Sequence, residues 1–123
     1  MKTDIIKICH RGIGLFGTNR PIGPVWHPFI LDWDNVFHEL TNDKGIIKII
    51  CGNIDNMSIV TQYCYKRKVR MTRYKERFVD VDLFYKAIDD FKLIYEGQKF
   101  NMFDFRRNCI GFKNFLMKRS IIN

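Results

Sequence analysis

Short apolar runs separated by turn-forming residues fill the first half of the chain. The runs lie at residues 5–9, 25–31, 36–40, 46–51 and 58–65, and turn formers occupy 32–35, 42–45 and 52–56. The last four of these runs, rich in Ile, Val and Phe, predict strands, and the short turns between them predict an antiparallel meander. The run at 5–9 fits a buried strand or the end of an arm. Residues 10–24 predict a loop, because they carry many chain breakers: Gly12, Gly14, Gly17, Pro21, Gly23 and Pro24.

The second half changes to a helical period. Residues 82–95 predict a helix, with Asp82 as its N-cap and Gly97 beyond its end. Residues 101–107 predict a short connector or strand, and residues 109–118 predict a second helix. Strands followed by helices predict an α+β fold, an antiparallel sheet packed against helices, in a single domain spanning residues 1–123. The apolar positions at helical spacing are Phe84, Ala87, Ile88, Phe91 and Ile94 in the first helix and Phe112, Phe115 and Leu116 in the second.

The chain is strongly basic, with a formal net charge of +8 and a pI near 9.5. Such a charge favours an anionic partner, either RNA or an acidic membrane surface, although charge that serves only solubility is the alternative. Tyr65 and Tyr74 flank or interrupt the most basic run, and aromatic rings can stack on unpaired bases. We predict nucleic-acid binding by this run rather than a merely solvated face. Its basic residues are Lys66, Arg67, Lys68, Arg70, Arg73, Lys75 and Arg77.

The four cysteines show no CxxC spacing, which favours free thiols in a reducing compartment. We expect Cys9, Cys51 and Cys64 to be small buried side chains. His10 lies beside Cys9, but no second pair has ligand spacing, so we expect no metal and no cofactor. The apolar run at 5–9 is too short for a signal peptide, and no run is long enough for a membrane span, so we expect a cytoplasmic protein.

Two local patterns carry candidate chemistry. His27 and His38 flank one turn on two predicted strands, and Cys109 opens the second predicted helix. A thiol at a helix N-terminus is favoured as thiolate by the helix dipole and by Arg106 and Arg107 before it. The expected site has Cys109 as nucleophile, His27 as general base and His38 as a polar partner, all close together.

These two patterns resemble a known group of proteins. The stretch VWHPFILDWDNVFHEL looks like the H-box of lecithin:retinol acyltransferase-like and NlpC-type proteins, and RRNCIGFKNFL looks like their NC box. The resemblance implies a permuted papain-like (H-box/NC) fold. Within that group, the short basic chain is most similar to the picornavirus 2A proteins of the H-box/NC type, as in parechoviruses. That similarity implies a viral protein in the host cytoplasm, at replication membranes, with viral or host replication proteins as partners.

Pro28 departs from the H-box pattern by following His27 directly. Proline cannot donate to a sheet ladder, so we expect the His27 ring to be displaced from a catalytic pose. This favours a non-proteolytic viral protein that supports RNA replication by binding RNA. The alternatives are a thiol acyltransferase or phospholipase working through a Cys109 acyl-enzyme, and a thiol isopeptidase. An enzyme would need a His27 nitrogen within hydrogen-bond reach of the Cys109 sulfur.

Overall fold

A computed structural model describes the backbone of residues 2–14, 21–53, 55 and 71–122, and side chains over these ranges except 10–14, 21–26 and 71–74. In these residues the chain forms a five-stranded antiparallel sheet with the strand order β4-β3-β2-β1-β5. The strands are β1 (Thr3–Gly14), β2 (Pro21–Leu31), β3 (Phe37–Asp43), β4 (Ile46–Gly52) and β5 (Met71–Asp80).

The predicted meander is confirmed for β2 to β4, which pair in sequence order. The run at 5–9 is part of β1, which pairs with β2 and β5. The predicted loop at 10–24 is wrong at both ends, because β1 continues through Gly14 and β2 starts at Pro21. The pairing of β1 with β2 shifts register between Gly12 and Gly14, so the glycines mark an irregularity within the ladder and not its end. The predicted strand at 58–65 lies outside the described residues.

Two helices follow the sheet, α2 (Val81–Tyr95) and α3 (Cys109–Ser120). Both agree with prediction apart from their caps and ends: the side chain of Asp80, not Asp82, accepts the N–H of Leu83 and caps α2. Gly97 has a φ of 90°, a left-handed conformation that favours glycine just beyond a helix. No helix in the described ranges has the length and apolarity needed to cross a membrane.

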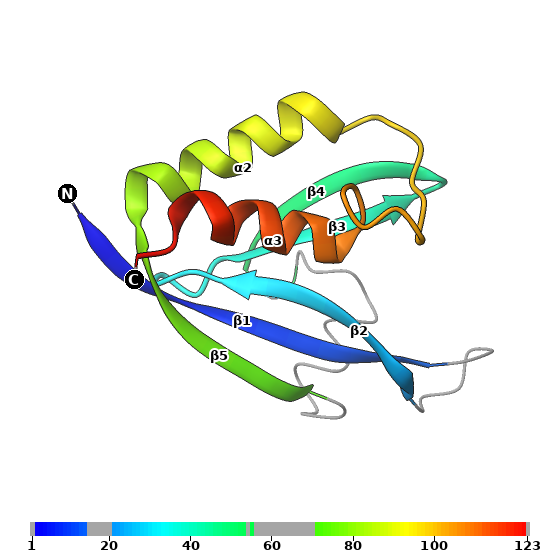
Figure 1. Cartoon of the computed structure of the whole chain (residues 1–123), viewed down its shortest axis with the longest axis horizontal. Helices are drawn as coiled ribbons and strands as arrows, with labels where there is room; N and C mark the ends of the chain where they lie inside the picture. The colour runs from blue at the N-terminus through cyan, green and yellow to red at the C-terminus, as the bar shows by residue number, and fades with distance from the viewer. Residues whose placement is uncertain (1, 15–20, 54, 56–70, 123) are drawn as a thin grey trace.

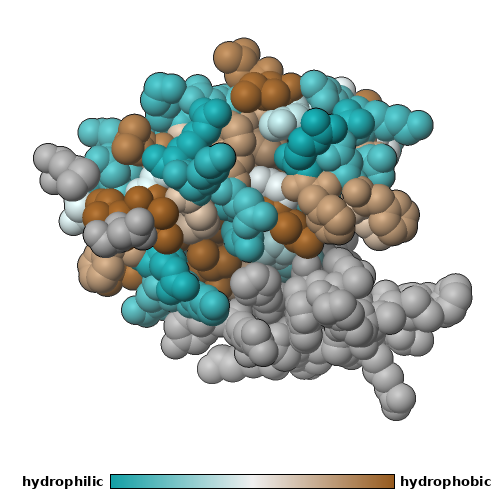
Figure 2. Space-filling model, viewed as in Figure 1, coloured by the Kyte–Doolittle hydropathy of each residue, from teal (hydrophilic) through white to brown (hydrophobic). Residues whose placement is uncertain are grey.

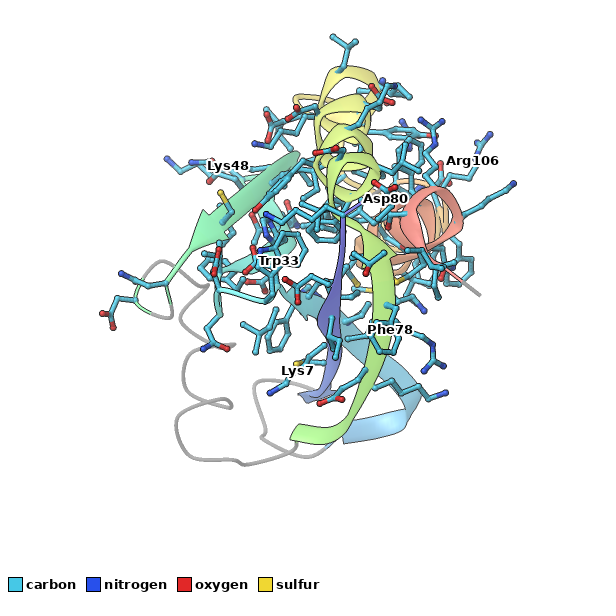
Figure 3. All side chains as sticks on the ribbon, turned by 90° about the vertical axis from the view of Figure 1, so that its left-hand side faces the viewer. Lys7, Trp33, Lys48, Phe78, Asp80 and Arg106 are labelled. Atoms are coloured by element: carbon cyan, nitrogen blue, oxygen red, sulfur yellow. The ribbon has the colours of Figure 1, made fainter. Side chains whose placement is uncertain are left out.

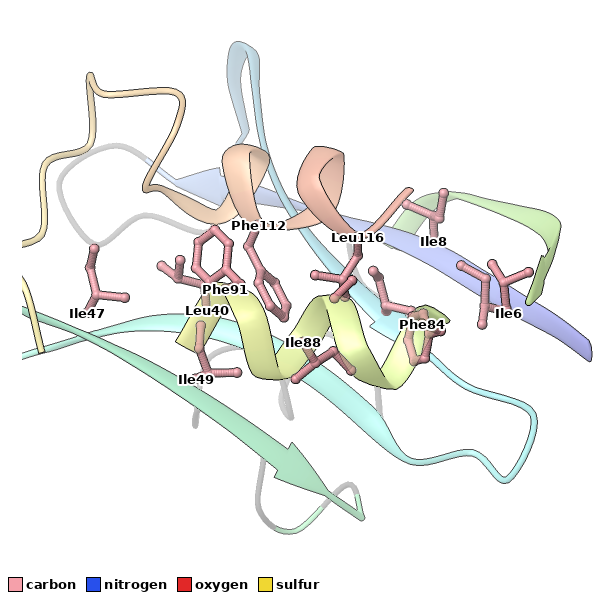
Figure 4. Close-up of a cluster of buried hydrophobic side chains, with 13 residues drawn as sticks. Ile6, Ile8, Leu40, Ile47, Ile49, Phe84, Ile88, Phe91, Phe112 and Leu116 are labelled. Carbon is pink, nitrogen blue, oxygen red and sulfur yellow. The ribbon is translucent and has the colours of Figure 1, made fainter. Parts of the chain in front are cut away.

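Both helices lie on one face of the sheet (Figure 1). The core on this face joins strand residues such as Ile6, Ile8 and Leu40 to Phe84 of α2 and Phe112 of α3 (Figure 4). The α+β prediction is therefore confirmed, whereas a permuted papain-like arrangement stays a prediction. A second buried cluster lies on the opposite face and consists of Cys9, Phe29, Leu31 and Phe37, with Ile50 packed against it.

Contacts near both edges of the sheet fix the helices. The carboxylate of Glu96, just past α2, accepts the N–H of Ile49 on edge strand β4 at 2.8 Å. At the other edge, Ile122 donates its N–H to the carbonyl of Phe78 on β5, and Ile121 bridges to Val79. These contacts place the end of α3 beside the end of β5.

Candidate functional site

His27 forms a buried pair with a carboxylate that the sequence analysis did not single out. Its Nε2 lies 2.7 Å from Oε1 of Glu39, whose side chain is fully buried. His27 is on β2 and Glu39 is on β3, so the pair ties two neighbouring strands together. The signal for it was present in the sequence, because Glu39 directly follows His38 and points to the other face of the same strand.

His38 forms a second, separate pair. Its Nε2 lies 3.0 Å from Oδ2 of Asp32, while Oδ1 of Asp32 accepts the N–H groups of Asp34 and Val36 in the preceding turn. Because a carboxylate can only accept, Nε2 of His38 carries the hydrogen. The other ring nitrogen, Nδ1, is buried and has no hydrogen-bond partner among the described residues. The ring edge packs against Phe84 of α2.

The two histidines therefore lie on opposite faces of the sheet, which corrects the expectation that they meet. Ile30 pairs with His38 and Leu31 pairs with Phe37, so His38 shares the helix-covered face with Ile30. His27 alternates with Phe29 and Leu31, which belong to the cluster on the other face. The register between β1 and β2 is regular through this stretch, so no bulge rotates His27 back.

Cys109 begins α3, which packs its buried residues Phe112 and Leu116 against the helix-covered face. The sheet thus separates the element that carries Cys109 from the face that carries His27. His38 shares the face but does not hydrogen-bond the thiol, because its bonded nitrogen is engaged by Asp32 and its other nitrogen has no partner in the described ranges. The structure does not bring the predicted triad together.

The other cysteines differ from one another. Cys9 is buried, as predicted, and burial raises the pKa of its thiol to about 12 despite the opposing charge of Lys7. Cys51 on β4 is exposed, so the expectation that it is buried is wrong. Cys51 alternates with Ile47 and Ile49, so it lies on the helix-covered face, but at the end of the edge strand and outside the buried core. Cys64 lies outside the described residues.

The side chain that accompanies Cys109 is Lys113, one helical turn later. Burial, reinforced by the positive charge of Lys75, holds the pKa of the Lys113 ammonium below its usual range, and Cys109 opposes this shift. The three groups are close enough to interact electrostatically, and they come from the first turns of α3 and from β5. Sequence reasoning missed Lys113, although its i+4 spacing from Cys109 predicts a shared helix face.

A basic surface runs along β5 beside α3. Lys75 and Arg77 alternate with Val79, which is buried in the core beneath the helices, so both point to the helix side of the sheet. Both side chains are exposed, and Lys113 of α3 is close enough to Lys75 to interact with its charge. We call Lys75, Arg77 and Lys113 the β5–α3 surface.

The predicted basic run is described only in part. Lys66, Arg67, Lys68 and Arg70 lie outside the described residues, and Arg73 is described only as backbone within β5. Lys75 and Arg77 are exposed, as a binding role requires, but exposure alone does not test that role.

Pro28 occupies a position where its missing N–H is tolerated. The pairing of β2 with β3 includes Ile30 and Leu31 but ends before Pro28, although β2 is an interior strand. Proline therefore falls where that ladder has already stopped. Beyond this point the side chains of His27 and Glu39 join the two strands instead.

Over the described residues, no group of three or more His, Cys, Asp or Glu side chains is placed to hold a metal ion. Comparison with known proteins gives no match to a family model, a curated protein or a solved structure. The resemblance to H-box/NC proteins consequently stays a prediction that depends on the two sequence boxes.

His38 gives a prediction for the pH dependence of stability. Burial lowers the pKa of His38, although the hydrogen bond and charge of Asp32 oppose the shift. The unfolded chain therefore takes up a proton that the folded chain resists, and stability should fall as pH drops below about 6.5, the ordinary histidine value. Urea unfolding at neutral and mildly acidic pH should show a smaller loss in His38→Gln than in the wild type. An unchanged loss would contradict the role given to His38.

Proposed function

We propose that this protein binds RNA through the β5–α3 surface and that it does not act as a Cys109–His27 enzyme. The observation that carries the proposal is the placement of Lys75 and Lys113 on one side of the sheet, next to the N-terminal end of α3. The basic run that leads into β5 extends the positive charge in sequence. Phosphate groups bind such surfaces mainly by charge, whatever the base sequence.

Mutual repulsion between Lys75 and Lys113 supports the proposal. Two ammonium groups held near each other disfavour their own charged forms, and this repulsion contributes to the lowered pKa of Lys113. A phosphate placed between them would relieve this repulsion and favour the charged form of Lys113. The helix dipole at the start of α3 adds a further attraction for an anion.

The thiol acyltransferase alternative has less support. It needs a base that reaches Cys109, and His27 lies on the other face of the sheet in a buried pair with Glu39. His38 is held by Asp32. Arg106 and Lys113 supply positive charge but are not substitutes for the imidazole pair that the family resemblance implies.

Replacing the three basic side chains together should weaken RNA binding. The variant Lys75→Ala/Arg77→Ala/Lys113→Ala should bind a fluorescently labelled single-stranded RNA on the order of a hundredfold less tightly at low salt, because three phosphate contacts are lost. The slope of log affinity against log salt should fall by about 2, since each contact to a single strand contributes about 0.7. Fluorescence anisotropy over a salt series measures both quantities.

A matched control removes the same charge elsewhere. Lys44, Lys48 and Lys99 are exposed residues near edge strand β4, at the other side of the sheet from β5; Figure 3 shows Lys48 on β4 and Phe78 on β5. The variant Lys44→Ala/Lys48→Ala/Lys99→Ala should keep most of the affinity. Equal losses of affinity in the two triple variants would mean that net charge alone drives RNA binding. No loss in either variant would contradict RNA binding through the β5–α3 surface.

A further inference from the structure

Three large apolar side chains are exposed on the connector between α2 and α3. Phe103 is 82% exposed, Phe105 is 63% exposed and Met102 is 55% exposed. Figure 2 shows apolar side chains gathered at the side of the molecule where Figure 1 places this connector. We call Met102, Phe103 and Phe105 the apolar tip. Exposed apolar groups that lie together mark interaction sites more often than single exposed residues do.

The backbone that carries the apolar tip is tightly held. The side chain of Asn101 accepts the N–H of Phe103, and the carbonyl of Asn101 accepts the N–H of Asp104. The amide of Asn108 donates to the carbonyl of Met102 at 2.9 Å, which fastens the connector to the start of α3. These hydrogen bonds therefore hold the connector in the conformation that exposes the side chains of the apolar tip.

Basic residues lie next to the apolar tip along the chain. Arg106 is exposed between Phe105 and Arg107, and Lys99 bridges the connector to Ile46 at the start of β4. The acidic side chain next to the tip, Asp104, is engaged by Arg106 and by Arg107 at 2.8 Å, so its charge is offset. Because two arginines face one carboxylate here, the segment that carries the tip keeps a net positive charge. Figure 3 shows Arg106 reaching outward beside α3.

We propose that the apolar tip inserts into the interfacial region of a membrane rich in anionic lipid. Aromatic side chains favour this region, and basic residues beside them attract anionic headgroups. Neither signal alone gives firm attachment, but the two together do. A protein partner fits less well, because a stable protein interface needs about 800 Å² on each side, far more than three side chains on a short connector offer.

Tryptophan placed at the tip would report insertion directly. In Phe103→Trp, addition of phosphatidylcholine vesicles that contain about one-third phosphatidylserine should shift the emission of the new indole to shorter wavelength, and brominated lipid should quench it. The matched control is Leu93→Trp, because Leu93 on α2 is 87% exposed and lies outside the tip. The emission of the indole added in this control should not change. Equal responses at both positions, or none at position 103, would overturn the proposal.

Truncation separates the tip from the β5–α3 surface. Phe103→Ala/Phe105→Ala should bind these vesicles at least about tenfold less tightly in co-sedimentation, because apolar area is no longer buried. The same variant should bind RNA as the wild type does. Vesicle binding that is lost only in Lys75→Ala/Arg77→Ala/Lys113→Ala would show that the basic surface, not the tip, contacts lipid. Concentration-dependent dimers that disappear in Phe103→Ala/Phe105→Ala would assign the tip to a second copy of the chain.

Discussion

Glu39→Ala should destabilise the protein by about 3–5 kcal/mol, the range seen when one partner of a buried ion pair or charged hydrogen bond is removed. The carboxylate of Glu39 is fully buried and lies 2.7 Å from Nε2 of His27. Its removal leaves a cavity beside a buried imidazole that has lost this partner. Because small domains are stable by only about 5–15 kcal/mol, the loss should be plain in urea unfolding at neutral pH.

Two variants distinguish the loss of the His27–Glu39 pair from the loss of side-chain volume and from the loss of a negative charge. Glu39→Gln keeps the shape and one acceptor oxygen, so it should lose clearly less stability than Glu39→Ala. Asp89→Ala removes a carboxylate from an exposed position on α2 and should change stability by less than about 0.5 kcal/mol. A Glu39→Ala protein as stable as Asp89→Ala would contradict the structural role of the His27–Glu39 pair.

Gly111→Ala should also be strongly destabilising, by about 1–3 kcal/mol or more. Gly111 lies in the first turn of α3, where a Cβ atom would collide with the backbone of Phe105 and Arg106. Backbone cannot move aside as a flexible side chain can. The start of α3 or the connector must shift, and that shift also disturbs the hydrogen bond that the N–H of Gly111 donates to the side-chain oxygen of Asn108.

The comparison with other substitutions to Ala identifies the cause. Asn114→Ala changes an exposed residue of the same helix and should be neutral or slightly stabilising, because Ala favours helix. Gly97→Ala meets no atom within 4 Å, but its φ of 90° makes Ala strained there, so it should cost about 1 kcal/mol. A Gly111→Ala protein no less stable than Asn114→Ala would mean that the connector does not pack against α3 as described.

The fold was largely predictable because its signals are local. The turn at residues 42–45 contains Lys44 and Gly45, both with positive φ, as tight hairpins require, and the sequence Asn-Asp-Lys-Gly indicates such a turn. The helix period over residues 82–95 is equally local. The extension of β1 to Gly14 was not predictable, because it depends on pairing with β2 and β5, which lie far along the chain.

The candidate site failed for a reason of register. Whether His27 and His38 share a face depends on which residues pair across the turn, and one residue of slip moves a side chain to the other face. The turn pairs Leu31 with Phe37, so position 41, not 38, would lie opposite position 27. The apolar pattern predicts that the strands exist, but it does not predict which residues pair across the turn. Lys113 and Glu39 were not predicted either, because their partners Lys75 and His27 lie on other elements.

Protection of Cys109 by RNA tests the central claim most directly, because it uses the natural side chains of the protein. Cys109 lies at the start of α3, beside Lys113, whereas Cys51 is exposed on β4, the edge strand opposite β5. Maleimide labelling with peptide mass spectrometry should show that saturating single-stranded RNA slows modification of Cys109 about tenfold or more and leaves Cys51 unchanged. Protection of Cys51 with Cys109 unprotected, or of neither, would contradict RNA binding at the β5–α3 surface.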